Sequence, residues 1–250
     1  MKRFLKLYKI EQKLGFRCPD GIVFGIAMPV GVLILIAVIA GGKVAGDTGY
    51  TFLESAFASL IAVGICACAF MGLPLTIADY RDKKILKHFF VTPCSPKWIL
   101  GANVLCNVVT AVISALAITF VSVVAFDYHM KGNPLFFVGA WLLTLISMFS
   151  IGMMLASLCR TVKTANVVTS LVYFPMLFLS GATIPFELFP RGLQRVASVL
   201  PLTQGIKLMK ATSMMSERGT QAESVVGIVI LLIAITVVCT FISVKAFRWE

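Results

Sequence analysis

One stretch of sequence decides the fold: Phe57–Ile77, FASLIAVGICACAFMGLPLTI, which contains no Asp, Glu, Lys, Arg or His. An α-helix needs about 20 consecutive apolar residues to cross the ~30 Å hydrocarbon core of a bilayer, and this stretch meets that requirement. Inside a bilayer no water is available to the backbone amides and carbonyls, so a helix is the conformation that satisfies them. The stretch therefore predicts a transmembrane helix.

Five more stretches without a charged residue or histidine occur along the chain. They run from Ile22 to Ala40, Val104 to Val124, Phe136 to Leu158, Ala165 to Leu179 and Val225 to Val244. We predict an all-α integral membrane protein with six transmembrane helices in one domain, residues 1–250, whose membrane region covers 22–244. The fifth stretch provides only about 22 Å of helix at ~1.5 Å per residue, so another segment must complete its crossing.

The composition supports a membrane protein. The 250 residues are 59% hydrophobic and 13% charged, with a mean hydropathy of +0.95, whereas soluble chains are ~45–50% apolar and ~25% charged. The net charge is +11, but its Lys and Arg residues lie in short loops between apolar stretches. A nucleic-acid-binding protein gathers them on one folded face, so we expect no nucleic-acid partner.

Lys and Arg are divided unequally between the two sides of the membrane. The N-terminal segment has six, the loop from Ala78 to Leu100 five, Cys159 to Thr164 two and the C-terminal end two, whereas the opposite side has seven in total. Loops rich in Lys and Arg stay in the cytoplasm. We therefore predict a multi-pass protein of the plasma (cell) membrane with both termini in the cytoplasm.

The sequence contains no recognisable catalytic motif. It lacks the G-x-x-x-x-G-K-[ST] phosphate loop, the H-E-x-x-H metal site and the G-x-S-x-G nucleophile turn. Cys66 and Cys68 lie two residues apart, so on a helix they point about 200° away from each other and cannot readily hold one ion. We predict no catalytic residue, no metal site and no enzymatic activity in this chain.

The N-terminal segment, residues 1–20, predicts a helix that lies in the membrane interface. Its basic and apolar residues fall on opposite faces of a helix over residues 2–14. The basic face has Lys2, Lys6, Lys9 and Lys13, and the apolar face has Phe4, Leu7, Tyr8 and Leu14.

The cytoplasmic loop between the second and third stretches combines basic and apolar residues. Its first part can form a short helix that ends before Pro93. Such a loop can simply set the topology, but an apolar and basic short helix is also what docking to a soluble partner requires. The candidate docking residues are Arg81, Asp82, Lys83, Lys84, Ile85, Leu86, Lys87, Phe89 and Phe90.

The segment after the fifth stretch, residues 179–203, is too apolar for an external loop and too broken by Gly and Pro for an ordinary span. We predict a re-entrant external hairpin whose turn is held against protein, because unsatisfied backbone cannot face lipid. The alternative is an amphipathic helix on the outer surface. The candidate hairpin residues are Ser180, Gly181, Thr183, Pro185, Phe186, Glu187, Pro190 and Pro201.

In this order, the two segments resemble those of the permease subunits of type-2 ATP-binding-cassette (ABC-2) exporters, and the resemblance covers nearly the full length. Leu179–Phe186, followed by Leu200–Thr203, is similar to the external hairpin of that family, and the element Thr92-Pro93-x-Ser95-Pro96 agrees with it. The resemblance implies a dimer with a second permease copy, identical or different, surrounded by membrane lipid. It also implies a separate ABC ATPase subunit that binds ATP and Mg, so that this chain itself needs no cofactor.

The resemblance also assigns roles to segments. The loop from Arg81 to Val91 would be the coupling helix that contacts the ATPase, and residues 2–14 the interfacial connecting helix. The substrate pathway would form between spans one, two and five, where the candidate residues are Asn166, Thr169, Ser170, Tyr173 and Phe174. Ser, Thr and Asn also bridge membrane helices, so helix packing is the other interpretation of these positions.

Two functions follow from these expectations. The first is the permease of an ATP-driven exporter, which forms the substrate pathway. The second is a membrane interaction or immunity subunit that binds an ATPase or a sensor without transporting anything. Loss of efflux on deletion of this chain alone would distinguish them.

The predicted topology can be tested by thiol labelling of intact cells. The seven native cysteines all fall in predicted spans or cytoplasmic segments, so a membrane-impermeant maleimide should label none of them. Single cysteines introduced by Thr48→Cys or Gly219→Cys should react from outside. Labelling of Cys94 from outside would overturn the orientation.

Overall fold

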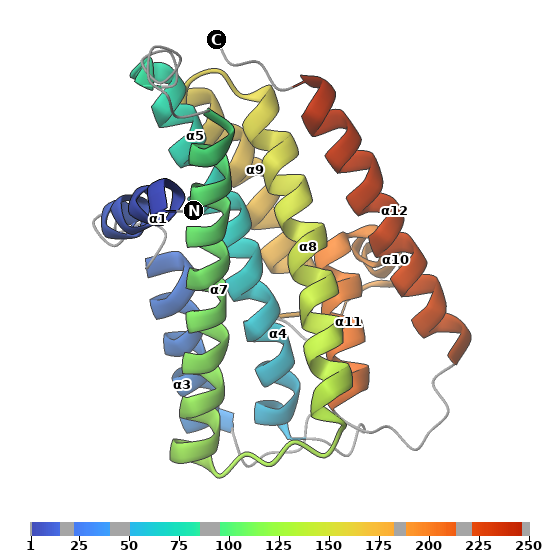
Figure 1. Ribbon diagram of the computed structural model, residues 1–250. Coiled ribbons are helices and arrows are strands. Elements are labelled where there is room, and N and C mark those ends of the chain that lie inside the picture. Colours follow the sequence, from blue (N-terminus) through green and yellow to red (C-terminus); the bar gives the residue numbers. More distant parts are fainter. Residues whose placement is uncertain are drawn as a thin grey trace.

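The computed structural model describes residues 2–15, 23–40, 51–85, 96–182, 189–213 and 222–246 (Figure 1). These residues are almost entirely helical, and no strand occurs among them. The all-α class predicted from the sequence is therefore confirmed.

The helices follow one another in a simple order. A crosswise helix α1 (Lys2–Gly15) comes first, followed by η1 (Val23–Ala27), which continues into α3 (Met28–Ala40). Next come α4 (Phe52–Ala67), η3 (Cys68–Gly72), α5 (Leu73–Asp82), α7 (Pro96–Phe126), α8 (Pro134–Leu158), α9 (Val162–Leu179), α10 (Arg191–Val199), α11 (Pro201–Ser213) and α12 (Ala222–Ala246).

Among the described residues, 5 helices are long and apolar enough to cross a membrane. They are Phe52–Asp82, Trp98–Phe126, Pro134–Leu158, Val162–Leu179 and Val225–Ala246. The predicted first span is present as a shorter apolar helix, Val23–Ile39. Five of the predicted spans are thus found at spanning length, and the total of six stays a prediction.

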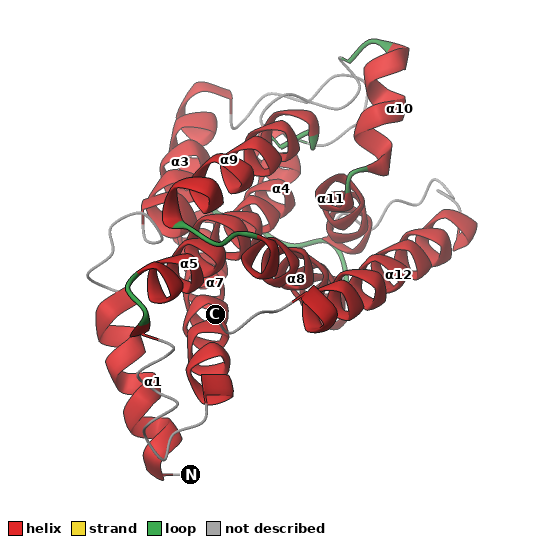
Figure 2. Cartoon of the chain, turned by 90° about the horizontal axis from the view of Figure 1, so that it is seen from above, coloured by secondary structure: helices red, strands yellow, loops and turns green. Residues whose placement is uncertain are grey.

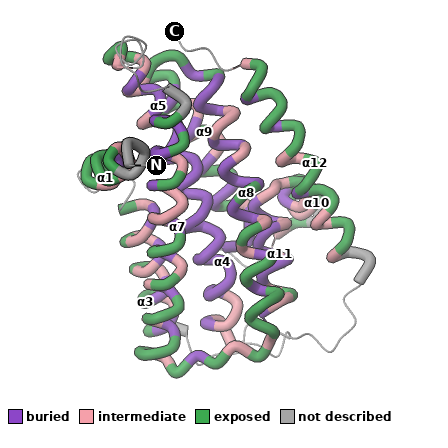
Figure 3. Tube along the Cα trace, in the orientation of Figure 1, coloured by how far each residue is buried: buried purple, intermediate pink, exposed green. Residues whose placement is uncertain are grey.

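The second predicted span is the central helix of the molecule. The elements α4, η3 and α5 follow one another directly from Phe52 to Asp82 and are surrounded by α3, α7, α8, α9 and α11 (Figure 2). Almost every residue of α4 is buried (Figure 3). The span extends beyond the predicted Phe57–Ile77 because its charged ends, Glu54 and Asp79 to Asp82, also adopt helix.

Small residues let the helices of the bundle approach one another closely. A Cβ atom on Gly152 of α8 would lie 2.2 Å from the backbone oxygen of Ala69 in η3, and one on Gly205 of α11 would lie 2.5 Å from Cγ2 of Thr144 in α8. Lipid tails are as apolar as the side chains, so helix association in a membrane depends on such close packing.

Polar contacts lock the end of the bundle opposite α1. Thr51 and Glu54 form a capping box at the start of α4, and the Glu54 carboxylate also pairs with Lys131 at 2.8 Å. Lys210 of α11 donates to Oγ of Ser55 at 2.9 Å. Here the α7–α8 connection and the end of α11 join the start of the central helix.

The described ends of the chain lie toward the same end of the bundle. Figure 1 shows α1, the end of α5 and the end of α12 in its upper half, and the α7–α8 connection at the bottom. This arrangement agrees with an even number of crossings.

The close approach at Gly152 generates a stability prediction. Gly152→Ala should lower the free energy of unfolding by about 1–3 kcal/mol, because the added methyl group must push α8 away from η3. The matched control is Gly139→Ala on the same helix, where a Cβ meets nothing within 4 Å. Thermal unfolding in detergent micelles should show a lower Tm for Gly152→Ala only. Equal Tm values for the two variants would contradict the close contact.

Candidate functional site

The candidate site lies on α9, which corresponds to the fifth predicted span. The helix starts at Val162 because the Thr161 hydroxyl caps it by accepting from the Thr164 amide at 3.2 Å. Beyond its C-terminal end, Gly181 has a φ of 80°, a left-handed conformation that glycine adopts without strain. This turn ends α9 about half-way along the bundle (Figure 1).

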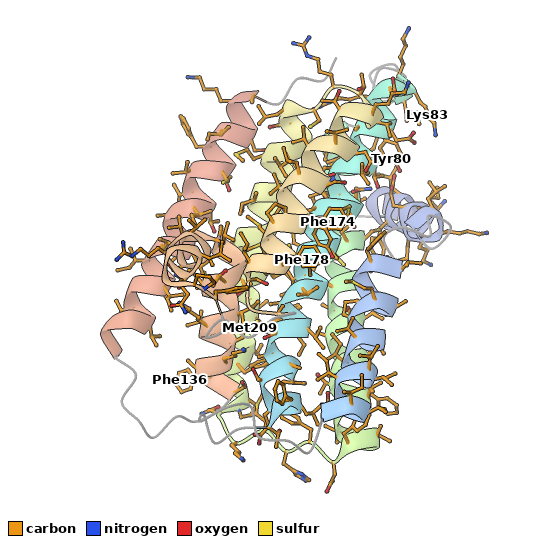
Figure 4. All side chains as sticks on the ribbon, turned by 180° about the vertical axis from the view of Figure 1, so that it is seen from behind. Tyr80, Lys83, Phe136, Phe174, Phe178 and Met209 are labelled. Atoms are coloured by element: carbon orange, nitrogen blue, oxygen red, sulfur yellow. The ribbon has the colours of Figure 1, made fainter. Side chains whose placement is uncertain are left out.

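One face of α9 points away from the bundle and forms an open groove. Asn166, Ser170 and Phe174 recur every four residues along this face and line a shallow, open depression, which we call the groove of α9. Val167, Leu171 and Pro175 complete the lining, and none of them was predicted. Phe178, which is exposed, continues the face beyond Phe174 (Figure 4).

The other two predicted pathway residues face the core of the bundle. Thr169 and Tyr173 are fully buried, and the Thr169 hydroxyl donates to the backbone oxygen of Ala165 at 2.7 Å. Consecutive positions on an α-helix point about 100° apart, so Thr169 and Ser170 cannot share a face. Thr169 and Tyr173 thus pack in the core and do not line the groove, and the pathway role of all five residues stays a prediction.

The groove combines apolar walls with small polar groups. The Ser170 hydroxyl donates to Oδ1 of Asn166 at 3.4 Å, so these side chains offer weak hydrogen bonding and no charge. In the part of the chain that the structure describes, no group of three or more His, Cys, Asp or Glu residues could hold a metal ion. The groove is suited to contact with an amphipathic molecule or with another helix.

The segment predicted as a coupling helix begins as the last turn of α5. Arg81 and Asp82 belong to that helix, and Lys84, with a φ of 56°, follows its end. The expected separate helix therefore does not start at Arg81. Leu86, Lys87, Phe89 and Phe90 lie outside the described residues.

Arg81 has a structural partner that the sequence did not reveal. Its Nη1 donates to the backbone oxygens of Ala156 at 2.8 Å and of Cys159 at 2.7 Å. These carbonyls are at the C-terminal end of α8, where backbone oxygens lack helical partners and the helix dipole favours a cation. Arg81 therefore caps α8 and joins it to α5.

Of the neighbouring predicted residues, three are exposed and one packs within the chain. Asp82, Lys83 and Lys84 are exposed, and Lys83 pairs with Asp79 at 2.8 Å. Ile85 instead packs against the small cluster of Tyr80 and Ile99. The exposed surface at this end is thus charged in the described residues, and Ile85 is partly used for packing within the chain.

The re-entrant hairpin stays a prediction, because the described part of this segment contains two helices that differ in direction. In Figure 2, α10 lies at the edge of the bundle, perpendicular to its axis, whereas α11 runs along that axis. Pro190 precedes α10 and Pro201 is the first residue of α11, a position that proline favours. Ser180 and Gly181 form the turn after α9, and Thr183, Pro185, Phe186 and Glu187 lie outside the described residues.

The end predicted for this segment was wrong. α11 continues to Ser213, ten residues past the predicted end at Thr203. Lys207 and Lys210 made this part of the sequence look like an external loop, but Lys210 extends to Ser55 at the end of the bundle. Figure 1 shows α11 beside α4, in the half of the bundle away from α1, beyond the level at which α9 ends. The fifth span is longer than the predicted Ala165–Leu179, because α9 begins at Val162 and has 18 residues.

These features define an all-helical, multi-pass membrane protein with an open groove along α9 and a crosswise N-terminal helix. The sequence profile of the ABC-2 type transporter family matches residues 3–214. The chain therefore belongs to the ABC-2 type transporter family.

Several relatives carry transport names. The chain is 27% identical over 133 residues to the inner membrane transport permease YhhJ of Escherichia coli (strain K12), covering 52% of this chain and 35% of that protein. It is 28% identical over 229 residues to nodulation protein J of Bradyrhizobium diazoefficiens, covering 90% and 81%. It is 23% identical over 144 residues to the probable multidrug ABC transporter permease YbhR of Escherichia coli (strain K12), covering 58% and 39%. The match thus spans well under two thirds of YhhJ and YbhR.

The capping role of Arg81 can be tested against its neighbour. Arg81→Ala should lower the free energy of unfolding by about 2 kcal/mol, because hydrogen bonds from a charged donor to two backbone oxygens are lost. Lys83→Ala removes only an exposed ion pair with Asp79, which is worth about 0–1 kcal/mol. Thermal unfolding in detergent should separate the two variants. A Tm for Arg81→Ala equal to that of Lys83→Ala would contradict the cap.

Proposed function

We propose that this chain is the transmembrane permease subunit of an ATP-driven ABC exporter, which pairs with a second permease and forms the substrate pathway at their interface. The observation that carries the proposal is the polar and aromatic stripe of Asn166, Ser170 and Phe174 on the outward face of α9. A polar side chain facing lipid loses hydrogen bonds with water. A second permease or a hydrated pathway on this face would satisfy it.

The outward face of α12 provides a contrast within the same molecule. Its large exposed residues include Val226, Ile230, Val237 and Phe241, which is the composition expected against lipid tails. The α9 face has a polar side chain at two successive turns instead. We therefore assign the surface of α12 to lipid and the groove of α9 to the partner permease and the transported molecule.

The energy for transport comes from a separate ABC ATPase subunit, which binds ATP and Mg. The sequence has no phosphate loop, and a relative is named a probable multidrug ABC transporter permease. The ATPase would dock at the end of α5, where Asp82, Lys83 and Lys84 are exposed. With this end in the cytoplasm, as the Lys and Arg distribution predicts, both termini are cytoplasmic too.

The second candidate function is a membrane interaction or immunity subunit that binds an ATPase or a sensor without transport. An affinity-tagged chain should co-purify with an ABC ATPase if it is the permease, and also if it is an interaction subunit whose partner is an ATPase. Mass spectrometry of the culture medium separates them, because deletion of a permease removes at least one exported compound and complementation restores it. If the ATPase co-purifies and the medium is unchanged on deletion, the chain is not the permease.

The groove can be tested with two phenylalanines. Phe174→Ala should reduce export about fivefold for the compound that disappears from the medium when the chain is deleted. This is the effect expected when ~1 kcal/mol of aromatic contact is lost. Phe241→Ala on α12, where the ring is also exposed, should export at the wild-type rate. Both variants should insert normally in the membrane. Equal export by the two variants would show that the groove of α9 is not part of the pathway.

A further inference from the structure

The interfacial helix α1 carries a buried carboxylate. Glu11 is 7% exposed, although Lys9, Ile10 and Lys13 on the same helix are exposed. The Tyr80 hydroxyl of α5 donates to Oε2 of Glu11 at 2.6 Å. Figure 4 shows Tyr80 near the end of α5, beside α1. Burying an acidic side chain costs free energy unless it is hydrogen-bonded. The hydrogen bond from Tyr80 offsets part of that cost.

Glu11 also contacts the neighbouring helix α7. Asn103, which is itself buried, lies beside Glu11. Burial raises the pKa of Glu11, and the Tyr80 hydroxyl and the Asn103 side chain act in the opposite direction. One side chain of α1 thus bonds to the central helix and lies against α7.

The polar contacts continue from Asn103 to an irregular point of the central helix. Nδ2 of Asn107 donates to Oδ1 of Asn103 at 3.2 Å and to its backbone oxygen at 3.0 Å. Asn107 lies directly against Gly72 at the end of η3, where a Cβ atom would be 2.0 Å from Oδ1 of Asn107. Asn103 and Asn107 therefore place a hydrogen-bonded polar pair of α7 between the buried carboxylate of α1 and Gly72 of the central helix.

Beside Asn107, the central helix departs from α-helical geometry. η3 (Cys68–Gly72) is a π-helical segment, and Pro74, which follows it, has no backbone N–H to donate. A π-helical turn is an irregularity that often occurs at functional sites. The cytoplasmic half of the central helix, α5, is thus separated from α4 at a defined point and is bonded to α1.

We propose that Glu11 is the positioning residue that fastens the interfacial helix to α5 and α7, so that α1 follows the movement of α5. The inference rests on the proposed function only for its consequence in transport, because the fastening itself is a property of this chain. The carboxylate accepts a hydrogen bond from Tyr80 of α5 and lies beside Asn103 of α7. Glutamine keeps one acceptor oxygen and a similar shape, whereas alanine keeps none.

The chain contains a native reporter of this contact. Cys106 of α7 is buried under α1, with Sγ 3.8 Å from the backbone oxygen of Tyr8. Movement of α1 away from α7 would uncover this thiol. Cys239 on α12, which is also buried, serves as an internal standard because α12 does not lie next to α1 (Figure 2).

The experiment measures the rate at which N-ethylmaleimide labels Cys106 in the full-length chain in lipid nanodiscs, by mass spectrometry and relative to Cys239. Glu11→Ala should raise this rate about tenfold, as expected on loss of buried hydrogen bonds. Tyr80→Phe, which removes one donor and keeps the ring, should raise it by a smaller factor. Glu11→Gln should stay within about twofold of wild type, as should Lys9→Ala on the exposed face of α1.

A wild-type labelling rate in both Glu11→Ala and Tyr80→Phe would overturn the proposal, and so would equal increases in Glu11→Gln and Glu11→Ala. If Glu11→Ala does not fold, Tyr80→Phe and Glu11→Gln still decide between these outcomes. With the ATPase subunit bound, the fastening predicts less export per ATP hydrolysed in Glu11→Ala than in Lys9→Ala, and equal ratios would overturn it. A chain that binds no ATPase but shows the labelling pattern would refute the proposed function alone.

Discussion

The structure depends on close packing around a central helix that lipid never reaches. In a bilayer the apolar side chains gain little by leaving lipid for protein, so helices must associate through close contact and through the few polar bonds between them. The central helix Phe52–Asp82 meets this constraint with small residues along α4 and with glycines on its neighbours, such as Gly152. The surrounding helices are positioned by these contacts, and the outward faces of α9 and α12 follow from them.

Polar interactions are concentrated at the two ends of this packed centre. At one end Glu54 pairs with Lys131, and Lys210 bonds to Ser55. At the other end Arg81 caps α8, and Glu11 joins the interfacial helix to Tyr80. The free-energy cost of a charged group is smallest near the membrane surfaces, where water solvates it. Between the two ends, α11 lies beyond the level at which α9 ends, so the shorter helix with the groove is accommodated within a closely packed bundle.

Much of the fold could be predicted because lipid requires long stretches without charge. The stretches Val104–Val124 and Phe136–Leu158 each lie inside a helix of the structure. The prediction of helix ends failed where a helix contains charge. Lys207 and Lys210 made α11 look like a loop, and Glu54 placed the predicted start of the second span after the true start of α4. Charge is tolerated there because each of these helix ends has a partner at the surface of the bundle.

The sequence could not say how the candidate residues of α9 are oriented. Asn166, Ser170 and Phe174 line the groove, whereas Thr169 and Tyr173, chosen for the same chemistry, are buried in the core. Residue type alone does not say which face of a helix meets the bundle. Glu11 was missed because it lies among lysines on a helix that looks amphipathic, and only its contact with Tyr80 distinguishes it.

The central claim is that the outward face of α9 meets a second permease, and cysteine cross-linking in native membranes tests it most directly. With the native cysteines replaced, Phe178→Cys places one thiol on this face, and Phe241→Cys places one on α12 as a control; both positions are exposed. If the second permease is identical, an oxidant should link the Phe178→Cys protein into a covalent dimer. If it is a different ABC-2 permease, a bifunctional thiol reagent should link the two chains, and mass spectrometry should identify the partner. In both cases the Phe241→Cys protein should stay monomeric. A covalent dimer through position 241 and none through position 178 would contradict the central claim.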